Sequence, residues 1–339
     1  MTVEEVRVAR YPAGPVRAED FEVAGAGAPP APGDGQVLVA LRGLGLNAGM
    51  ATRIGAAGTP YGPGLTIGSV PASDAVVEVL VSRSDTFRPG DLAVRPRSPW
   101  RTADVADAGE LRRIPGESAD LPLETHLTVL GHVGFTAYTG MVHLGRVAPA
   151  ETVYVSGAAG GVGSCAVQLA KAHGARVVGS AGSDEKVGLL TGELGVDAFN
   201  YRHGAALDLL RAAAPDGIDL FFDNIGGEQL EAALEVLNFR GRAMICGLAS
   251  QYGTAGAARG PANYARLIYR ELTLRGFAVT AHEDLRPRFE REVGKLVREG
   301  MLRSVHTSVV GFERTPDAFA TLLAGGNSGR MIVTCARGM

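Results

Sequence analysis

A glycine-rich turn is the clearest chemical signal in the sequence. Residues 158–164 read AAGGVGS, and only Gly157 separates them from the strand-like run TVYVS at residues 152–156. A parallel strand that runs into a helix leaves backbone N–H groups free at the helix N-terminus, where they and the helix dipole favour an anion. A pyrophosphate approaches only where no Cβ blocks it. The turn supplies small residues there, although Ala158 replaces the first glycine of G-x-G-x-x-G, so we predict a dinucleotide site.

The end of the next expected strand, residues 175–180, bears on which dinucleotide binds. An NAD site usually has an acid about twenty residues on, which binds the ribose 2′-hydroxyl groups. Here the strand is followed by AGS, and Lys186 stands close behind. Serine and lysine suit the 2′-phosphate of NADPH, because it is charged and accepts hydrogen bonds. Asp184 and Glu185 argue the other way, but they stand where helix N-termini take acids, so we predict NADPH.

No metal site is expected. Catalytic zinc takes about three Cys, His or carboxylate ligands, and structural zinc usually takes four. Residues 1–122 contain no cysteine, and the histidines that follow lack the spacing of a two-histidine helix site. The chain has three cysteines, which are far apart: Cys165, Cys246 and Cys335. We interpret them as free thiols of a reducing cytoplasm, and Cys246 as a small apolar residue rather than a nucleophile.

The composition limits the classes of partner. With 46% hydrophobic and 20% charged residues, the chain is typical of globular proteins. A formal net charge of -3 gives no reason to expect nucleic acid or an anionic membrane as a partner. No apolar run is long enough to span a bilayer, and the first residues lack the apolar core of a secretory signal. We therefore expect a cytoplasmic enzyme.

The elements that position the turn follow two patterns. Residues 1–120 are rich in strands and turns, as in a small barrel or sandwich, with strands expected at 36–42 and 75–82 and a loop at 24–35. Further on, strand and helix patterns alternate, which predicts βαβ units in a parallel sheet with helices on both faces. The expected strands there are 152–156, 175–180, 218–223 and 241–246, and the expected helices are 163–173, 184–194 and 228–237. Residues 331–335 return to a strand pattern. A length of 339 residues suits two domains.

A series of motifs accompanies the glycine turn in a fixed order. They are LGHVGFTAY at 130–138, DNIGG at 223–227, CGLASQY at 246–252, RGF at 275–277 and GNSGR at 326–330. Together they resemble the zinc-independent medium-chain dehydrogenase/reductase superfamily, in the branch of prostaglandin reductases, 2-alkenal (double-bond) reductases and curcumin reductases. The resemblance covers nearly the whole chain.

This resemblance implies a fold and an activity. It implies an α/β protein with a Rossmann domain, a doubly wound parallel sheet that binds NADPH, over residues 123–304. A GroES-like β-barrel domain over residues 1–122, completed by residues 305–339, would carry the substrate side. Members reduce the carbon–carbon double bond of α,β-unsaturated ketones and aldehydes with NADPH, and they are commonly dimers. We therefore expect a small-molecule substrate and a homodimer.

The resemblance also assigns roles to residues. The pyrophosphate would lie along Ala159, Gly160, Gly161 and Val162. The 2′-phosphate would be surrounded by Ser183, Lys186 and Tyr201. The rest of the cofactor would be lined by Thr136, Asn224, Cys246, Phe277 and Asn327. Tyr252 would face the substrate.

The match fails at the entrance of the substrate pocket. Where the family often has Asp-Pro-Tyr-Met-Arg, residues 47–51 read NAGMA, so the aromatic ring and the arginine are missing. We expect Asn47 and Gly49 to border a roomier or reshaped pocket. His132 replaces a more common apolar residue, and we expect it to line the same pocket.

Conjugate reduction requires two things of such a site. The nicotinamide and the alkene must be held face to face, and the developing enolate oxygen needs a preorganised donor. Tyr252 is the candidate donor, together with a ribose hydroxyl of the cofactor. A quinone oxidoreductase and a biosynthetic tailoring enzyme on a large substrate, even a non-reductive one, stay open as alternatives. So does a protein that binds NADPH without turnover.

Overall fold

The computed structural model describes residues 2–55, 63–114, 116–118, 120–251 and 260–335. The chain forms two compact units, Met1–Leu127 with His306–Met339, and Thr128–Val305. Within the described residues, no helix combines the length and the apolar character that crossing a bilayer requires.

The second unit is built on a six-stranded sheet in which every neighbouring pair of strands is parallel. Its strands are β8 (Thr152–Val155), β9 (Arg176–Ala181), β10 (Asp197–Asn200), β11 (Ile218–Asp223), β12 (Leu237–Ile245) and β13 (Thr273–Gly276). The spatial order is β10-β9-β8-β11-β12-β13, so the chain reverses direction across the sheet between β8 and β11. This is the Rossmann order, and it confirms the predicted doubly wound sheet.

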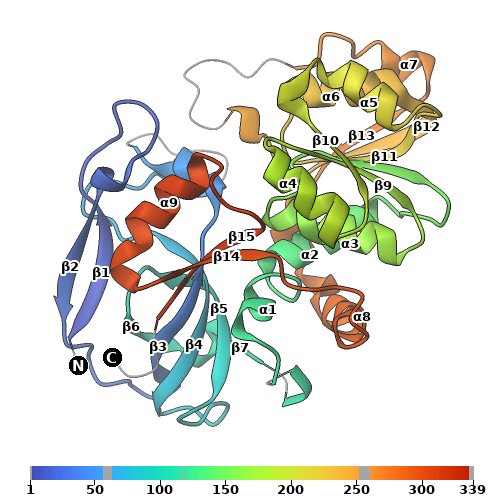
Figure 1. Cartoon of the computed structure of the whole chain (residues 1–339). Coiled ribbons are helices and arrows are strands. Elements are labelled where there is room, and N and C mark those ends of the chain that lie inside the picture. The colour runs from blue at the N-terminus through green and yellow to red at the C-terminus, as the bar shows by residue number, and fades with distance from the viewer. Residues whose placement is uncertain (1, 56–62, 115, 119, 252–259, 336–339) are drawn as a thin grey trace. The chain divides into compact units, whose positions relative to one another are not determined.

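Helices cover both faces of this sheet. Figure 1 shows α5 and α6 on one face and α3 and α4 on the other. The helices of the unit are α2 (His132–Tyr138), α3 (Gly161–Ala172), α4 (Asp184–Gly188), α5 (Ala206–Ala213), α6 (Gly227–Val236), α7 (Arg266–Tyr269) and α8 (Arg286–Arg298). The longer helices bury an apolar stripe, as α5 does with Ala206 and Leu210, four residues apart. In the core beneath α5 and α6, the rings of Tyr154 and Phe221 stack with centroids 4.9 Å apart.

One expected helix is only partly α-helical. The pattern predicted a helix over residues 184–194, but α4 ends at Gly188 and a π-helical segment, Leu189–Glu193, follows. Gly188 and Gly192 stand in this stretch, and glycine weakens a regular helix. The last turn closes with the wider hydrogen bond from the Leu194 N–H to the Leu189 carbonyl.

The first unit contains a seven-stranded sheet and a separate hairpin. Its elements are β1 (Val3–Val8), β2 (Phe21–Gly27), β3 (Gln36–Gly45), β4 (Ala72–Ser82), β5 (Leu92–Pro99), β6 (Ala103–Asp107), β7 (Arg112–Arg113), α1 (Leu123–Leu127), β14 (His306–Val310), α9 (Thr315–Leu323) and β15 (Arg330–Thr334). The order is β14-β15-β3-β4-β5-β7, with β6 also on β3. The expectation of a loop at 24–35 is wrong for residues 24–27. They belong to β2 and pair with β1, because a backbone ladder needs no particular side chains.

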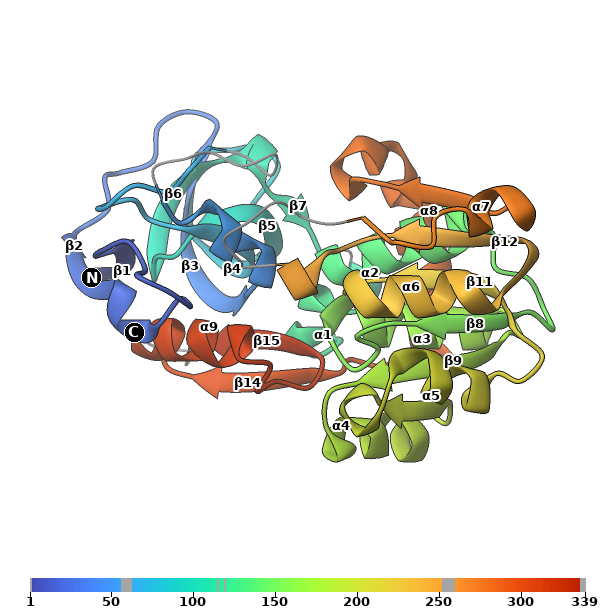
Figure 2. The ribbon, with the colours of Figure 1, turned by 90° about the horizontal axis from the view of Figure 1, so that it is seen from above.

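The last segment of the chain completes the core of the first unit. Figure 2 shows α9 beside β15 and β14. Phe319 of α9 packs edge-on against Phe21 and Trp100, with ring centroids 5.8 and 5.5 Å away. All three side chains are buried, so α9 is part of this hydrophobic core, although the whole second unit, Thr128–Val305, separates it from Trp100 in the sequence.

Candidate cofactor and substrate site

The predicted cofactor residues of the second unit lie along one edge of its sheet. Residues 159–162 follow β8, Ser183 and Lys186 follow β9, Tyr201 follows β10, Asn224 follows β11, Cys246 follows β12 and Phe277 follows β13. Because all six strands are parallel, their carboxyl ends meet at this edge, and the strand order reverses there between β8 and β11. Open α/β sheets bind ligands at such a reversal.

The glycine turn leaves the start of α3 open. Gly160 caps the helix in an extended conformation, and a Cβ built on it would meet only the Gly157 carbonyl oxygen, 3.3 Å away. A Cβ on Gly163 would lie 2.2 Å from that same oxygen, so the helix packs directly on the turn. The first N–H groups of α3 have no partner within the helix. This geometry fits a pyrophosphate, as NADPH requires.

The carboxyl end of β9 fits a phosphate better than a ribose hydroxyl. β9 ends at Ala181, and Ser183 caps α4 by accepting a hydrogen bond from the Lys186 N–H at 3.3 Å. Burial lowers the pKa of Lys186, the charge of Glu185 partly offsets this, and the nearby charge of Arg202 lowers the pKa again. Arg202 was not singled out in the sequence, because it follows Tyr201 by one residue and no pattern marks it.

Asp184, the acid that argues against NADPH, has partners of its own. Its Oδ1 accepts a hydrogen bond from Asn200 Nδ2 at 2.8 Å and lies 3.3 Å from His203 Nε2. Both partners come from the end of β10 and the turn after it. Asp184 is therefore engaged at the helix start, in agreement with its interpretation as an N-terminal helix acid.

The residues assigned to the nicotinamide end are closely packed. Phe277 lies against Gly140, where a Cβ would be 2.5 Å from its Cζ. Thr136, on α2, is buried and donates from Oγ1 to the His132 carbonyl at 2.8 Å. Desolvation raises the pKa of the Cys246 thiol to about 12, with a smaller contribution from Asp223. A thiol of that pKa is neutral at physiological pH, which suits a lining residue and not a nucleophile.

The predicted residues of the first unit lie on two neighbouring segments. Asn47 follows β3 and accepts a hydrogen bond from the Gly49 N–H at 2.9 Å. Asn327 precedes β15, is buried, and donates from Nδ2 to the Gly329 carbonyl at 2.6 Å. The two segments are joined where the Leu46 N–H donates to the Met331 carbonyl at 2.9 Å. Tyr252 lies outside the described residues.

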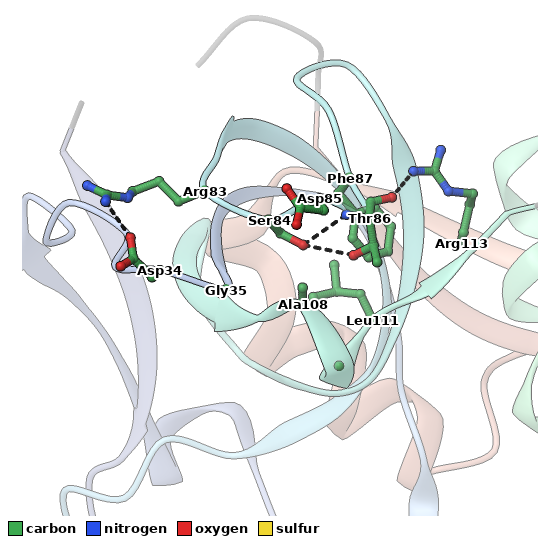
Figure 3. Close-up of a pocket in the computed structure, with 11 residues that line it drawn as sticks. Asp34, Gly35, Arg83, Ser84, Asp85, Thr86, Phe87, Ala108, Leu111 and Arg113 are labelled. Atoms are coloured by element: carbon green, nitrogen blue, oxygen red, sulfur yellow. Dashed lines mark hydrogen bonds and ion pairs between the residues drawn. The ribbon is translucent and has the colours of Figure 1, made fainter.

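Two other features of the described residues bear on the chemistry of the protein. Among the residues that the structure describes, no group of three His, Cys, Asp or Glu side chains is placed to hold a metal ion. A surface depression of the first unit lies beside the turn that joins β4 and β5 (Figure 3). Phe87 and Leu111 line it, with the Arg83–Asp34 ion pair at its rim. None of the predicted site residues lines this depression.

Comparison with known proteins gives consistent matches. Residues 161–294 match the family described as zinc-binding dehydrogenase, and residues 4–114 match the N-terminal domain of oxidoreductase. Prostaglandin reductase 1 of Rattus norvegicus is 39% identical over 264 residues, which cover 77% of this chain and 80% of that protein. (+)-Pulegone reductase of Mentha piperita is 34% identical over 90% of this chain and 89% of its own.

A solved structure matches over the full length. CurA from Vibrio vulnificus in complex with NADPH has a TM-score of 0.91 and 28% identity, and the match covers 99% of this chain and 100% of that one. The predicted fold class, a Rossmann sheet with a GroES-like β domain, is confirmed by this similarity together with the sheet orders of the two units.

Proposed function

Because this chain belongs to the zinc-independent reductase branch of the medium-chain dehydrogenase/reductase superfamily and is an NADPH-dependent oxidoreductase, we propose that it is an ene-reductase. Its substrate would be an α,β-unsaturated ketone or aldehyde, reduced at the carbon–carbon double bond. The observation that carries the proposal is the similarity over nine-tenths of the chain to a pulegone reductase, since pulegone is an α,β-unsaturated ketone.

The second unit would hold the cofactor through the residues at the carboxyl edge of its sheet. When bound, NADPH supplies the hydride. The small residues 159–162 leave room for the pyrophosphate, and Lys186 and Ser183 offer a cation and a hydroxyl to the 2′-phosphate. Tyr201 packs over Gly182 and closes the same corner. Phe277, Cys246, Thr136 and Asn224 would line the nicotinamide end, and Asn327 of the first unit stays a proposed lining residue of the cofactor.

The substrate side would work by hydrogen bonding without a metal. We propose that the Tyr252 hydroxyl donates to the oxygen of the enone, where negative charge develops as the β-carbon is reduced. Asn47 and Gly49 would border the substrate pocket, and His132 stays a proposed lining residue. The small residue at Gly49 and the missing arginine would admit a wider range of substrates than the family pattern allows.

We also propose that the enzyme works in the cytoplasm as a homodimer. The cysteines Cys165, Cys246 and Cys335 are free thiols, which suits a reducing compartment.

The proposed dimer would form at the edge of the sheet. β13 is the last strand of its sheet, and all four of its residues are exposed. Ile268 and Tyr269, just before it, expose 73% and 76% of their surface. A second copy that adds its own β13 would cover this edge, and light scattering would then give twice the mass of one chain.

The reaction is tested by mixing the enzyme and NADPH with a panel of enones and enals and following the loss of nicotinamide absorbance. Product analysis then distinguishes the saturated ketone from an allylic alcohol. Tyr252→Phe should lower kcat for the enone and leave the Kd for NADPH unchanged, with Tyr11→Phe, an exposed tyrosine of the first unit, as the matched control. Tight NADPH binding with turnover of quinones only would replace the proposal by quinone reduction.

A further inference from the structure

Two buried polar side chains join the turns after β8 and β11, the strands between which the sheet order reverses. Ser156 and Asp223 are both fully buried, and the Ser156 hydroxyl donates to Asp223 Oδ1 at 2.8 Å. The Asn224 N–H donates back to the Ser156 hydroxyl at 2.9 Å, and Asn224 Nδ2 donates to the Ser156 carbonyl at 2.7 Å. Three hydrogen bonds thus link Ser156 to two residues that lie 67 and 68 positions further along the sequence.

Asp223 extends the link in two directions. Its Oδ1 also accepts from the N–H groups of Ile225 and Gly226, both at 2.9 Å, which fixes the start of α6. Its main-chain carbonyl accepts from the N–H groups of Cys246 and Gly247, at 2.8 and 3.0 Å. One residue therefore connects the glycine turn, the β11 turn and the segment after β12.

The glycine turn after β8 and the turn after β11 are also in direct contact. Gly157 has a φ of +58°, which favours glycine, and a Cβ there would lie 3.0 Å from Cδ1 of Ile225. A shift of the β11 turn would therefore move the glycine turn with it. Such coupling is what a preorganised binding turn needs, because a turn that is already ordered loses less entropy when its ligand binds.

The burial of Asp223 in this link is unfavourable for the stability of the folded protein. Oδ2 of Asp223 is buried and has no hydrogen-bond partner within the described chain. Burial raises the pKa of Asp223 even though Oδ1 accepts three hydrogen bonds. Burying a carboxylate with one oxygen unpaired is unfavourable, so stability alone is a poor reason for an acid at this position.

We propose that Ser156 and Asp223 are positioning residues for NADPH, which hold the glycine turn and the Cys246–Gly247 backbone in one fixed arrangement. Neither side chain needs to touch the cofactor. The inference depends on NADPH binding and not on the enone reaction. Its test is therefore a binding measurement, and its failure is distinguishable from the failure of the proposed substrate.

The test compares two buried serines of the second unit. Ser156→Ala removes the joining hydroxyl, whereas Ser180→Ala removes an equally buried hydroxyl whose partners are Tyr154 at 3.0 Å and Gln229 at 3.1 Å. Ser180 also meets the glycine turn through its main-chain carbonyl, which accepts from the Ala158 N–H at 2.9 Å, and the alanine variant keeps this bond. Both variants should lower Tm. Only Ser156→Ala should weaken NADPH binding, measured by nicotinamide fluorescence, by about tenfold, the loss that corresponds to one buried hydrogen bond to a charged group. Equal Kd values for both variants would overturn the inference.

A second pair of variants keeps the test decisive if Ser156→Ala does not fold. Asp223→Asn keeps an oxygen that can accept the three hydrogen bonds of Oδ1, whereas Asp223→Ala removes it. The asparagine variant should bind NADPH nearly as well as the unaltered protein, and the alanine variant about tenfold more weakly. If the two variants bind NADPH equally, whether tightly or weakly, the acceptor role assigned to Asp223 is wrong.

Discussion

The Tyr201 hydroxyl lies against the backbone of Gly182 at the carboxyl end of β9, so close that a Cβ on Gly182 would be 2.5 Å from it. The position of Tyr201 therefore depends on the absence of a side chain at Gly182, two residues before α4. Tyr201, Ser183 and Lys186 are the residues that we assign to the 2′-phosphate.

Gly182→Ala should therefore displace Tyr201 and weaken NADPH binding selectively. We expect the KM for NADPH to rise about tenfold, as for the loss of one charge-assisted hydrogen bond, with the KM for NADH unchanged. Gly192→Ala is the matched control, because nothing lies within 4 Å of a Cβ built there. A Gly182→Ala enzyme with an unaltered KM for NADPH would remove Tyr201 from the proposed site.

Lys186 should make NADPH binding sensitive to alkaline pH. Burial lowers its pKa from the ordinary value of 10.5, Glu185 partly offsets this, and Arg202 lowers the pKa again. Only the protonated amine attracts the phosphate, so NADPH affinity should fall as pH rises through the lowered pKa, before an ordinary lysine would lose its proton.

Lys186→Met should abolish this pH dependence and reduce the preference for NADPH over NADH by about 10- to 100-fold, the range of a hydrogen bond between charged groups. Titration of both cofactors against pH by fluorescence gives the result. Lys295→Met removes an exposed lysine of α8 and should change neither quantity. A Lys186→Met enzyme that keeps its full preference for NADPH would show that the 2′-phosphate is recognised elsewhere.

The glycine turn should tolerate no side chain at Gly163. A Cβ there would lie 2.2 Å from the Gly157 carbonyl oxygen, so Gly163→Ala must push α3 away from the turn. We expect a loss of about 1–3 kcal/mol in the free energy of unfolding, typical of overpacking, together with weaker NADPH binding. Gly188→Ala, in a helix with open space around its Cβ, should instead be neutral or stabilise the protein. Urea denaturation measures both, and equal stabilities would contradict the packing argument.

A buried ion pair anchors the last segment of the chain in the first unit. Arg330 and Asp74 are both buried, and the Arg330 guanidinium donates to the Asp74 carboxylate. Asp74→Ala should cost about 3–5 kcal/mol in the free energy of unfolding, because it leaves an uncompensated buried cation. The double variant Asp74→Leu with Arg330→Met should recover most of that loss, as measured by urea denaturation. If the single variant is as stable as the double one, the pair is not the anchor.

Local pattern predicted four of the six strands of the second unit, β8, β9, β11 and β12, and the helices α3 and α6, but it gave no expectation for β10, β13 or α5. Strand Ile218–Asp223 has the bounds that its apolar run predicts, and α3 begins at the glycine turn, because burial against a sheet leaves a clear periodic signal. The exposed strand β2 has no such periodic signal, so the pattern of residues 24–27 predicted a loop and not a strand. The π-helical turn after Gly188 was missed, because the apolar pattern of residues 184–194 does not distinguish α-helical from π-helical hydrogen bonds.

The sequence predicts those parts of the candidate site that depend on the backbone of a short segment. It does not predict contacts between residues that are far apart in the sequence. Small residues at 158–163, placed between a strand and an amphipathic helix, predict an anion-binding turn, and the missing acid after β9 predicts the phosphate. The contact between Ser156 and Asp223 joins positions far apart in the sequence, and no spacing rule predicts it. The roles of Tyr252, Asn47 and Gly49 stay predictions, since they depend on family resemblance alone.

The central claim is hydride transfer to an alkene carbon, and the position of an isotope label tests it most directly. The enzyme is supplied with NADPH deuterated at C4 of the nicotinamide, on either face in separate reactions, together with an enone that it consumes. The account predicts a saturated ketone with one deuterium on the β-carbon from one of the two labelled cofactors. Deuterium on the carbonyl carbon of an alcohol product, or consumption of NADPH without label in any product, would contradict it.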